Sequence, residues 1–599
     1  MKHDIAGRLA ALRTKMAAHN IAAAIIPQAD PHQSEYISDH WQLRRYLSGF
    51  TGSAGTLVVT ANGAYLWTDS RYFLQGAAQL EGSGIELMKE GIEGVPTINE
   101  WLCDNLAAGD TVAIDGMVYS ANATAALTAA LERHNLNVVA DFSAGSADIW
   151  PDRPALPACP VEVHDVKYAG ESASAKIAAM LGKAAKENGT DAIFISALDE
   201  IAWLLNIRSA DVKYNPVVTA FLYLAPGRTT LLIDDAKLTD EVRAYLAAEG
   251  VSTAAYADAL KFIEALPADE RVLVEADRNA VAIVNALGAR AVIAPSPVAI
   301  AKACKNDTQI AGIHAAMARD GVALVRSFME IERRAAGEGE PLTELGICEI
   351  LRRNRAASPM FRDESFGTIA GYGPHGAIVH YEPDAESDAA VVTGNLLLVD
   401  SGAQYLDGTT DITRTISLGT PTAQQKRDFT LVMKGHIALG SAIFPAGTTG
   451  HQLDVLARQF LWKEGLTYLH GTGHGVGFFL NVHEGPQSVR LNYVPTPLMP
   501  GMLTSNEPGL YRENVHGIRC ENLVLTVPAM TTEFGRFLKF ETVTLFPFDL
   551  SLFDTTIMSD SEIAWLNAYH TKVRETLTPL LANDDEREWL RAHTATLTR

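Results

Sequence analysis

Hydrophobic periodicity in the first half of the chain predicts alternating helices and strands. Apolar residues between Ile5 and Met16 recur at helical spacing behind Asp4, a typical N-cap residue, so a helix opens the chain. Short apolar runs follow it, two of them joined by the turn signal Asn62-Gly63. The predicted strands span residues 21–27, 56–60 and 64–67.

A similar order of elements returns further along the chain. A predicted helix over residues 174–186 ends at Asn188-Gly189, and strand-like runs follow at 192–195, 217–224 and 229–233. We interpret this order as a weak internal repeat of one α/β unit, with chance βα similarity as the alternative. Between the copies, residues 150–160 read WPDRPALPACP, and a proline at every third position indicates a linker.

A second boundary is expected near residues 294–305, where Pro295 and Pro297 precede a helix capped by Asn306 or Asp307. Two amphipathic helices are predicted at the other end of the chain, near 563–578 and 585–593. From the sequence alone they could pack on their own subunit.

Composition narrows the class of protein. The 599 residues suggest three or four domains, and 47% hydrophobic with 20% charged residues is ordinary for globular proteins. A formal net charge of −22 argues against nucleic acid and anionic membrane as partners, since both require a basic surface.

Five scattered cysteines suggest free thiols in a reducing cytoplasm. We expect no signal peptide, and no apolar run reaches the roughly 18 residues of a membrane span.

Two aspartates are expected to meet on one hairpin. Asp400 ends an apolar run, Asp411 precedes another at 412–418, and a turn signal lies at 406–408. Either two-residue loop puts both carboxylates on the same face, and the loop 406–407, which we prefer, makes them diagonal neighbours. Like charges across a ladder are destabilising, so a cation between them is one interpretation and an exposed edge hairpin is the other.

Three more residues strengthen the cation interpretation. His474 lies among four glycines in the stretch GTGHGVG, where backbone can approach a bound species closely. Glu507 is expected at a strand terminus because Pro508-Gly509 follows it. Glu521 interrupts the strand-like run 518–525 and needs a partner there, either a metal or a cation such as Arg519.

Together these residues form a plausible site for two metal ions. Four carboxylates and one imidazole form an oxygen-rich set that suits Mn, Co, Fe(II) or Zn. Four negative charges balance two divalent ions, whereas the set without ions repels itself. Two metals about 3.5–4 Å apart can bridge and deprotonate a water and polarise a carbonyl, so hydrolysis is the natural chemistry.

Six segments stand out in order along the chain: GAIVHY, VDSGAQYLDGTTDITRT, HGTGHGVG, VHEGP, SNEPGLY and IRCEN. They resemble the motifs of aminopeptidase P, the Xaa-Pro aminopeptidase family of pita-bread metallopeptidases. The pita-bread likeness runs from about Lys305 to Phe546. It implies an α/β (α+β) fold, in which two creatinase-N-like α/β domains, 1–155 and 156–303, precede a pita-bread catalytic domain at 304–599. A C-terminal extension would begin near 548.

The resemblance also implies metal roles. Asp400 would bind one ion, Asp411 and Glu521 would bridge the pair, and His474 and Glu507 would complete the other. Glu507 would in addition accept a proton from the bridging water. Two departures from the family are visible, His375 where Asn is usual and Cys520 where an aliphatic residue is usual, and neither removes a ligand.

Four further residues match substrate-side positions of the family. His380 and His483 would support the scissile carbonyl and its developing charge. His470 and Arg519 would line the substrate or support the ligands.

The implied activity is release of the N-terminal residue from peptides with proline in second position. It would depend on two divalent ions, Mn²⁺ foremost, with Zn²⁺, Co²⁺ or Fe²⁺ as alternatives. A cytoplasmic homodimer is expected. The rivals are a prolidase acting on dipeptides, a creatinase, and a pita-bread protein that binds partners without catalysis.

Overall fold

The computed structural model describes residues 4–599. This part of the chain divides into two compact units. One contains the residues up to 166 together with 171–298, and the other contains 167–170 together with 299–599. The first unit holds two six-stranded sheets, and the second holds all five predicted metal ligands.

The first sheet has the strand order β4-β3-β2-β1-β5-β6. Its central strand β1 runs antiparallel to β2 and parallel to β5. The predicted opening helix is confirmed as α1, whose N-cap Asp4 accepts a hydrogen bond from the backbone N–H of Gly7. The elements are α1 Ile5–Ala18, β1 Ala23–Pro27, α2 Leu43–Ser48, β2 Thr56–Thr60, β3 Ala64–Thr68, α3 Phe73–Leu80, β4 Glu86–Lys89, α4 Ile98–Asn105, β5 Thr111–Ala113, α5 Ala121–Glu132 and β6 Asn137–Val139.

The second sheet repeats this topology. Its order is β12-β11-β10-β8-β13-β14, and each strand pair has the same relative direction as its counterpart in the first sheet. The internal repeat predicted from the sequence is thereby confirmed in strand order. The elements are α7 Ala173–Asn188, β8 Ala192–Ile195, α8 Leu198–Leu205, β10 Ala220–Leu224, β11 Thr229–Ile233, α9 Asp240–Ala248, β12 Val251–Ala255, α10 Ala259–Glu264, β13 Val272–Val274, α11 Val281–Leu287 and β14 Ala291–Ile293.

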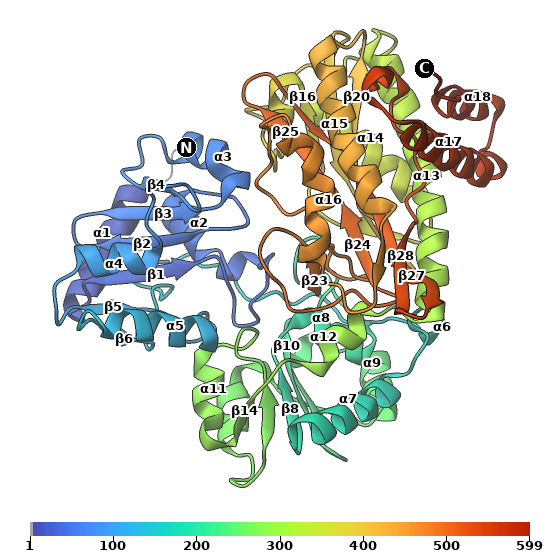
Figure 1. Ribbon diagram of the computed structural model, residues 1–599. Coiled ribbons are helices and arrows are strands. Elements are labelled where there is room, and N and C mark those ends of the chain that lie inside the picture. The colour runs from blue at the N-terminus through green and yellow to red at the C-terminus, as the bar shows by residue number, and fades with distance from the viewer. Residues whose placement is uncertain (1–3) are drawn as a thin grey trace. The chain divides into compact units, whose positions relative to one another are not determined.

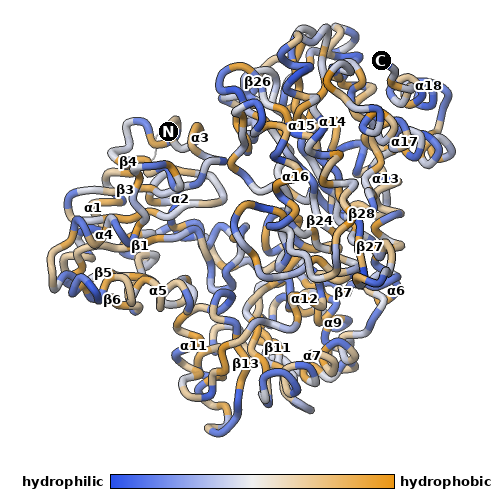
Figure 2. Tube along the Cα trace, in the orientation of Figure 1, coloured by the Kyte–Doolittle hydropathy of each residue, from blue (hydrophilic) through white to orange (hydrophobic). Residues whose placement is uncertain are grey.

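Burial in this unit follows the apolar strands. In the second sheet, every residue of β8, β10, β11 and β13 is buried, and these runs are largely hydrophobic in Figure 2. Residues 153–161, by contrast, form neither helix nor strand, as the regularly spaced prolines predict.

The second unit combines several sheets with long helices. Figure 1 shows α13 to α16, yellow-green to orange, flanking the orange and red strands. The first of these helices begins with Asn306 as its N-cap, in a capping box with Gln309. The helices are α13 Asp307–Ala335, α14 Glu344–Ala356, α15 Ala423–Gly440 and α16 Gly450–Trp462. A six-stranded sheet has the order β21 Ile443–Pro445, β28 Gly535–Thr542, β27 Asn522–Thr532, β24 Leu503–Asn506, β22 Gly473–Gly475 and β23 Glu484–Val489. Smaller sheets contain β15 Phe361–Glu364, β16 Ile369–Tyr372, β17 Asn395–Ser401, β18 Ala403–Tyr405, β19 Gly408–Thr409, β20 Ile412–Leu418, β25 Gly509–Arg512 and β26 His516–Arg519.

The predicted hairpin is present with the preferred loop. Tyr405 pairs with Gly408, so residues 406–407 form the turn. The same register continues into β17 and β20, where Asp400 pairs with Thr413. Asp411 therefore lies diagonally across from Asp400, as the period of two predicts.

The prediction of one strand over residues 518–525 is wrong. β26 ends at Arg519 and pairs with β25, whereas β27 begins at Asn522 and joins the six-stranded sheet. Between them, the backbone N–H of Glu521 donates to the carbonyl of Thr413 at 3.1 Å. The chain therefore leaves one sheet for another at Cys520 and Glu521.

The C-terminal residues pack on the second unit of their own chain. The two predicted helices are confirmed as α17 Asp560–Leu577 and α18 Asp584–His593. Leu566, Val573 and Leu590 belong to the large core of this unit, and the indole N–H of Trp589 donates to Glu332 at 2.7 Å. Among the described residues, no helix combines the length and low polarity that crossing a bilayer requires.

Candidate metal centre

Strand ends bring the predicted ligands together. Asp400 lies in β17 and Asp411 directly precedes β20. Glu507 directly follows β24 and Glu521 directly precedes β27. Since Asn506 pairs with Asn522 in these antiparallel strands, the next register position places Glu507 opposite Glu521.

His474 reaches the same place from β22. Its backbone N–H donates to the Ser505 hydroxyl at 2.9 Å, and that hydroxyl donates to Glu507 Oε1 at 3.1 Å. His474 Nε2 lies 3.4 Å from Asp411 Oδ2 and 3.4 Å from Glu507 Oε1. Asp411, His474 and Glu521 each offer a ligand atom, and these three atoms lie within 4.8 Å of one another.

The electrostatics of the cluster follow from burial and like charge. Burial, with Asp411 and Glu507 nearby, raises the pKa of Asp400 to about 6 against the opposing effect of Arg519. Burial and neighbouring carboxylates also raise the pKa of Glu507, and they raise that of Glu521 well above its usual range. Burial alone would lower the pKa of His474, but Asp411 and Glu507 outweigh it and raise that pKa to about 9.

The donor set fits a pair of divalent cations. Buried carboxylates that repel one another need compensating positive charge, and His474 with Arg519 supplies only part of it. Asp400 Oδ1 is buried without a hydrogen-bond partner among the residues described by the structure. Oxygen donors with one imidazole nitrogen suit divalent first-row metals.

Arg519 supports Asp400 and does not pair with Glu521. Its Nη2 donates to Asp400 Oδ2 at 2.6 Å and its Nε donates to the same oxygen at 3.2 Å. The alternative of a Glu521–Arg519 ion pair is therefore wrong. Glu521 instead accepts a hydrogen bond from the Thr413 hydroxyl at 2.7 Å.

Tyr511 connects Arg519 to another predicted residue. The Tyr511 hydroxyl accepts a hydrogen bond from Arg519 Nη1 at 2.9 Å and lies 2.8 Å from His470 Nε2. Neither Tyr511 nor Thr413 is among the site residues predicted from the sequence. The hairpin register could have found Thr413, since it is the position opposite Asp400.

The two remaining histidines lie in loops. The His483 ring is 4.3 Å from the His474 ring, centroid to centroid, in an edge-on arrangement. His380 is half-buried in the turn that follows the short 3-10 helix η6 (Gly373–Ala377). Its neighbours Ile378 and Tyr381 belong to an apolar cluster that also contains Tyr511.

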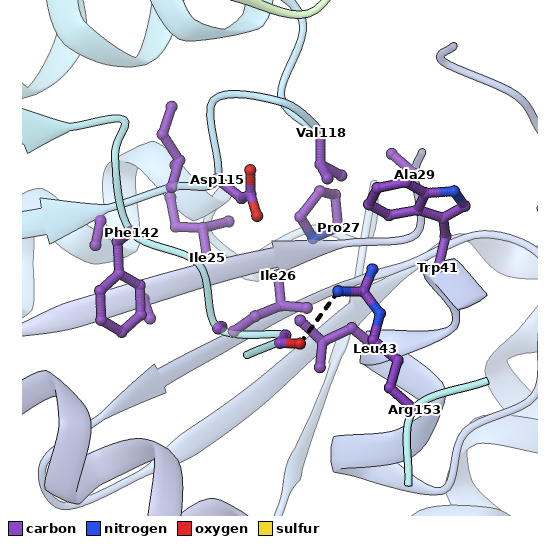
Figure 3. Close-up of a pocket in the computed structure, with 15 residues that line it drawn as sticks. Ile25, Ile26, Pro27, Ala29, Trp41, Leu43, Asp115, Val118, Phe142 and Arg153 are labelled. Atoms are coloured by element: carbon purple, nitrogen blue, oxygen red, sulfur yellow. Dashed lines mark hydrogen bonds between the residues drawn. The ribbon is translucent and has the colours of Figure 1, made fainter. Parts of the chain in front are cut away.

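A hollow in the first unit does not carry comparable chemistry. It lies beside β1 and β5, and Figure 3 shows Asp115, Trp41 and Arg153 among the residues around it. Arg153 donates to the carbonyl of Gly145 at 3.1 Å. The hollow has a volume of about 30 Å³, which leaves room for about two water molecules and not for a peptide.

Comparison with known proteins defines the class. Residues 311–528 match metallopeptidase family M24, and 536–597 match the C-terminal region of peptidase M24. Residues 8–144 and 152–309 each match the creatinase/prolidase N-terminal domain. The protein is thus an enzyme of the M24 metallopeptidases, and the predicted fold class, two creatinase-N-like domains before a pita-bread domain, is confirmed.

Full-length relatives narrow the family further. The chain is 42% identical to aminopeptidase P2 of Arabidopsis thaliana over 97% of this chain and 86% of that protein. It is 41% identical to a probable Xaa-Pro aminopeptidase P of Neosartorya fischeri over 99% of this chain and 93% of that protein. The crystal structure of X-prolyl aminopeptidase from Caenorhabditis elegans, a cytosolic enzyme with a di-nuclear active site, superposes with a TM-score of 0.94 at 34% identity, covering 99% of this chain and 100% of that one. The chain belongs to the aminopeptidase P (Xaa-Pro aminopeptidase) family.

Proposed function

We propose that this enzyme releases the N-terminal residue from peptides with proline in second position, using two divalent ions. The observation that carries the proposal is the convergence of Asp411, His474 and Glu521 within 4.8 Å, with Glu507 3.4 Å from His474. Full-length similarity to Xaa-Pro aminopeptidases supports the choice of substrate. Mn²⁺, a homodimer and a cytoplasmic location stay predictions.

Five side chains would hold the ions. Asp400 would bind one ion through both carboxylate oxygens, of which Oδ2 also accepts a hydrogen bond from Arg519. Asp411 and Glu521 would be shared, and His474 and Glu507 would complete the second position. When bound, the ions would supply Lewis acidity toward the scissile carbonyl and lower the pKa of water.

The chain's own residues would carry the remaining steps. Glu507 would accept the proton of the attacking water at its carboxylate. His483, beside His474, would donate a hydrogen bond to the carbonyl oxygen as negative charge develops there, and His380 would do the same. Arg519 would keep Asp400 ionised and oriented through its two hydrogen bonds.

Substrate recognition would begin at the free amine of the peptide. The amine would be held near the ions, so the first residue would be anchored close to the reacting carbonyl. His470, held by Tyr511 at 2.8 Å, would contribute to the wall of the substrate site.

The proposal is tested by measuring peptide cleavage by chelated protein before and after addition of Mn²⁺. The substrates are Xaa-Pro-Yaa tripeptides, Xaa-Ala-Yaa tripeptides and Xaa-Pro dipeptides. We expect the metal to restore cleavage of the Xaa-Pro-Yaa series, with little turnover of the alanine series. Turnover confined to dipeptides would indicate a prolidase. Failure of every divalent metal to restore turnover would contradict the proposal.

A further inference from the structure

One buried carboxylate accepts hydrogen bonds from several residues of a long irregular segment of the second unit. Glu344, the first residue of α14, has a relative exposure of 0%. Its Oε1 accepts hydrogen bonds from the backbone N–H of Tyr372 at 2.8 Å and from His375 Nδ1 at 2.9 Å. Its Oε2 accepts from the Tyr381 hydroxyl at 2.7 Å and from the backbone N–H of Ala389 at 3.1 Å. These four contacts are called the Glu344 clamp.

The clamp holds a segment with little regular structure of its own. Residues 378–389 form neither helix nor strand, so their position depends on side-chain and turn contacts. The backbone N–H of Glu344 also donates to the carbonyl of Ala389 at 3.1 Å, which closes the segment against α14. A buried carboxylate with several donors is strongly bonded, and removing its charge weakens all of those contacts together.

The clamped segment lies against the metal-centre side of the unit. Tyr381 and Ile378 pack in one apolar cluster with Tyr511, whose hydroxyl is bonded to Arg519. The preceding helix η6 lies so close to β26 that a Cβ atom on Gly517 would come within 1.6 Å of the Gly376 carbonyl oxygen. Glycine at 517 therefore allows η6 to lie directly on the strand that ends at Arg519.

The clamped segment contains His380, the residue with a proposed role in catalysis. It lies between Ile378, in the apolar cluster, and Tyr381, which is bonded to Glu344. Contact on both sides limits the freedom of the intervening turn. A catalytic imidazole must be held to within a fraction of an ångström, because misplacement by about 1 Å can cost about 100-fold in rate.

We propose that Glu344 is a positioning residue that fixes the turn carrying His380 for catalysis. The inference rests on the proposed function of His380. It assigns His375 a place in the same clamp as a hydrogen-bond donor to Glu344 and not as a group that touches substrate. An asparagine at 375 could donate through its amide in the same way, whereas alanine could not.

The first test needs no metal and no turnover. Hydrogen exchange in the metal-free protein compares E344Q with E349Q, the same substitution at an exposed position of the same helix. We expect faster exchange over residues 372–389 in E344Q, because glutamine keeps only one acceptor oxygen for donors that now share two. E349Q should exchange like the wild type. Unchanged protection of 372–389 in E344Q would overturn the clamp.

The second test measures the coupling to catalysis. In metal-loaded enzyme we expect E344Q to lower kcat for an Xaa-Pro-Yaa tripeptide by about 10- to 100-fold, with metal content unchanged and KM within about threefold. Y381F and H375A, milder variants that keep Glu344, should lower kcat less, and H375N should recover most of the loss caused by H375A. If E344Q does not fold, the kcat values of Y381F and H375A replace it as the test, and wild-type values in both would overturn the positioning role.

The two tests distinguish failure of this inference from failure of the proposed function. Wild-type protein that cleaves no Xaa-Pro peptide would overturn the proposed function, whereas the exchange experiment would still report on the clamp. Active wild type with unchanged kcat in every clamp variant would overturn only the positioning role of Glu344.

Discussion

Arg519 donates two hydrogen bonds to a single oxygen of Asp400, from Nη2 at 2.6 Å and from Nε at 3.2 Å. The two residues are 119 positions apart in sequence, and both are nearly or fully buried. The pairing leaves the other oxygen of Asp400 without a protein partner among the described residues. One side chain thereby both partly neutralises a ligand and orients it.

Replacing Arg519 with lysine is expected to impair the enzyme although it keeps the charge. An ammonium group cannot donate in the fixed planar arrangement by which Arg519 reaches both Asp400 and Tyr511. We expect R519K to lower kcat/KM by about 10- to 100-fold, as loss of a group supporting a metal ligand commonly does. The measurement is steady-state kinetics with metal content. R536K, on the exposed turn side of β28, should behave like the wild type.

Glu521→Gln should affect the stability of the metal-loaded protein much more than that of the metal-free protein. Burial and the neighbouring carboxylates raise the pKa of Glu521 and so disfavour its charged form, an environment that uncharged glutamine suits, and Thr413 can still donate to the amide oxygen. We expect E521Q to change the Tm of metal-free protein little and to abolish most of the Tm gain that Mn²⁺ gives the wild type. Thermal unfolding with and without Mn²⁺ measures both. An equal Mn²⁺-dependent gain in the two proteins would argue against Glu521 as a ligand.

The pH dependence of stability should depend in part on His570. Burial, helped by nearby Arg414, lowers the pKa of His570 to about 3, and its Nε2 accepts a hydrogen bond from the Phe548 N–H. The folded state therefore favours neutral His570, while the unfolded chain protonates near 6.5. This stabilisation is present above pH 6.5 and is lost as pH falls toward 3, by about 2 kcal/mol on reaching pH 5.

H570Q provides the comparison, because its amide oxygen can accept the same hydrogen bond and does not titrate. Metal-free wild type should lose more Tm between pH 7.5 and pH 5 than metal-free H570Q does. Equal losses would mean that His570 does not contribute to acid sensitivity. Using metal-free protein keeps changes in ion binding out of the comparison.

The C-terminal helices should be part of the folded catalytic unit. Leu590 in α18 is fully buried, whereas Leu580, just before this helix, is 51% exposed. We expect L590A to destabilise the protein by about 2–5 kcal/mol and L580A to stay within about 0.5 kcal/mol of the wild type. Denaturant unfolding measures both variants. Equal stability of L590A and L580A would contradict the packing of α18.

Local signals in the sequence were enough to predict the hairpin that contains Asp400 and Asp411 and the repeat of the α/β unit. The turn at 406–407 and the period of two fix where Asp400 and Asp411 lie relative to each other, without knowledge of the rest of the fold. The opening helix behind Asp4 and the helix behind Asn306 were predictable for the same reason, since capping is a local interaction.

The partners of Arg519 and Glu521 could not be predicted, because they depend on which sheets meet. Glu521 lies two residues from Arg519 in sequence, yet the chain changes sheets between them, and their side chains bond to Asp400 and Thr413 instead. The Glu344 clamp is likewise nonlocal. No pattern around residue 344 indicates that donors at 372, 375, 381 and 389 converge on it.

The number of ions that the enzyme needs for turnover tests the central claim most directly. Chelated protein should show no turnover of an Xaa-Pro-Yaa tripeptide, and titration with Mn²⁺ should restore it as two ions bind per chain. D411N, which removes a shared ligand, should bind fewer ions and remain inactive. Full turnover in thoroughly chelated protein, or restored wild-type turnover without ion binding, would contradict the account.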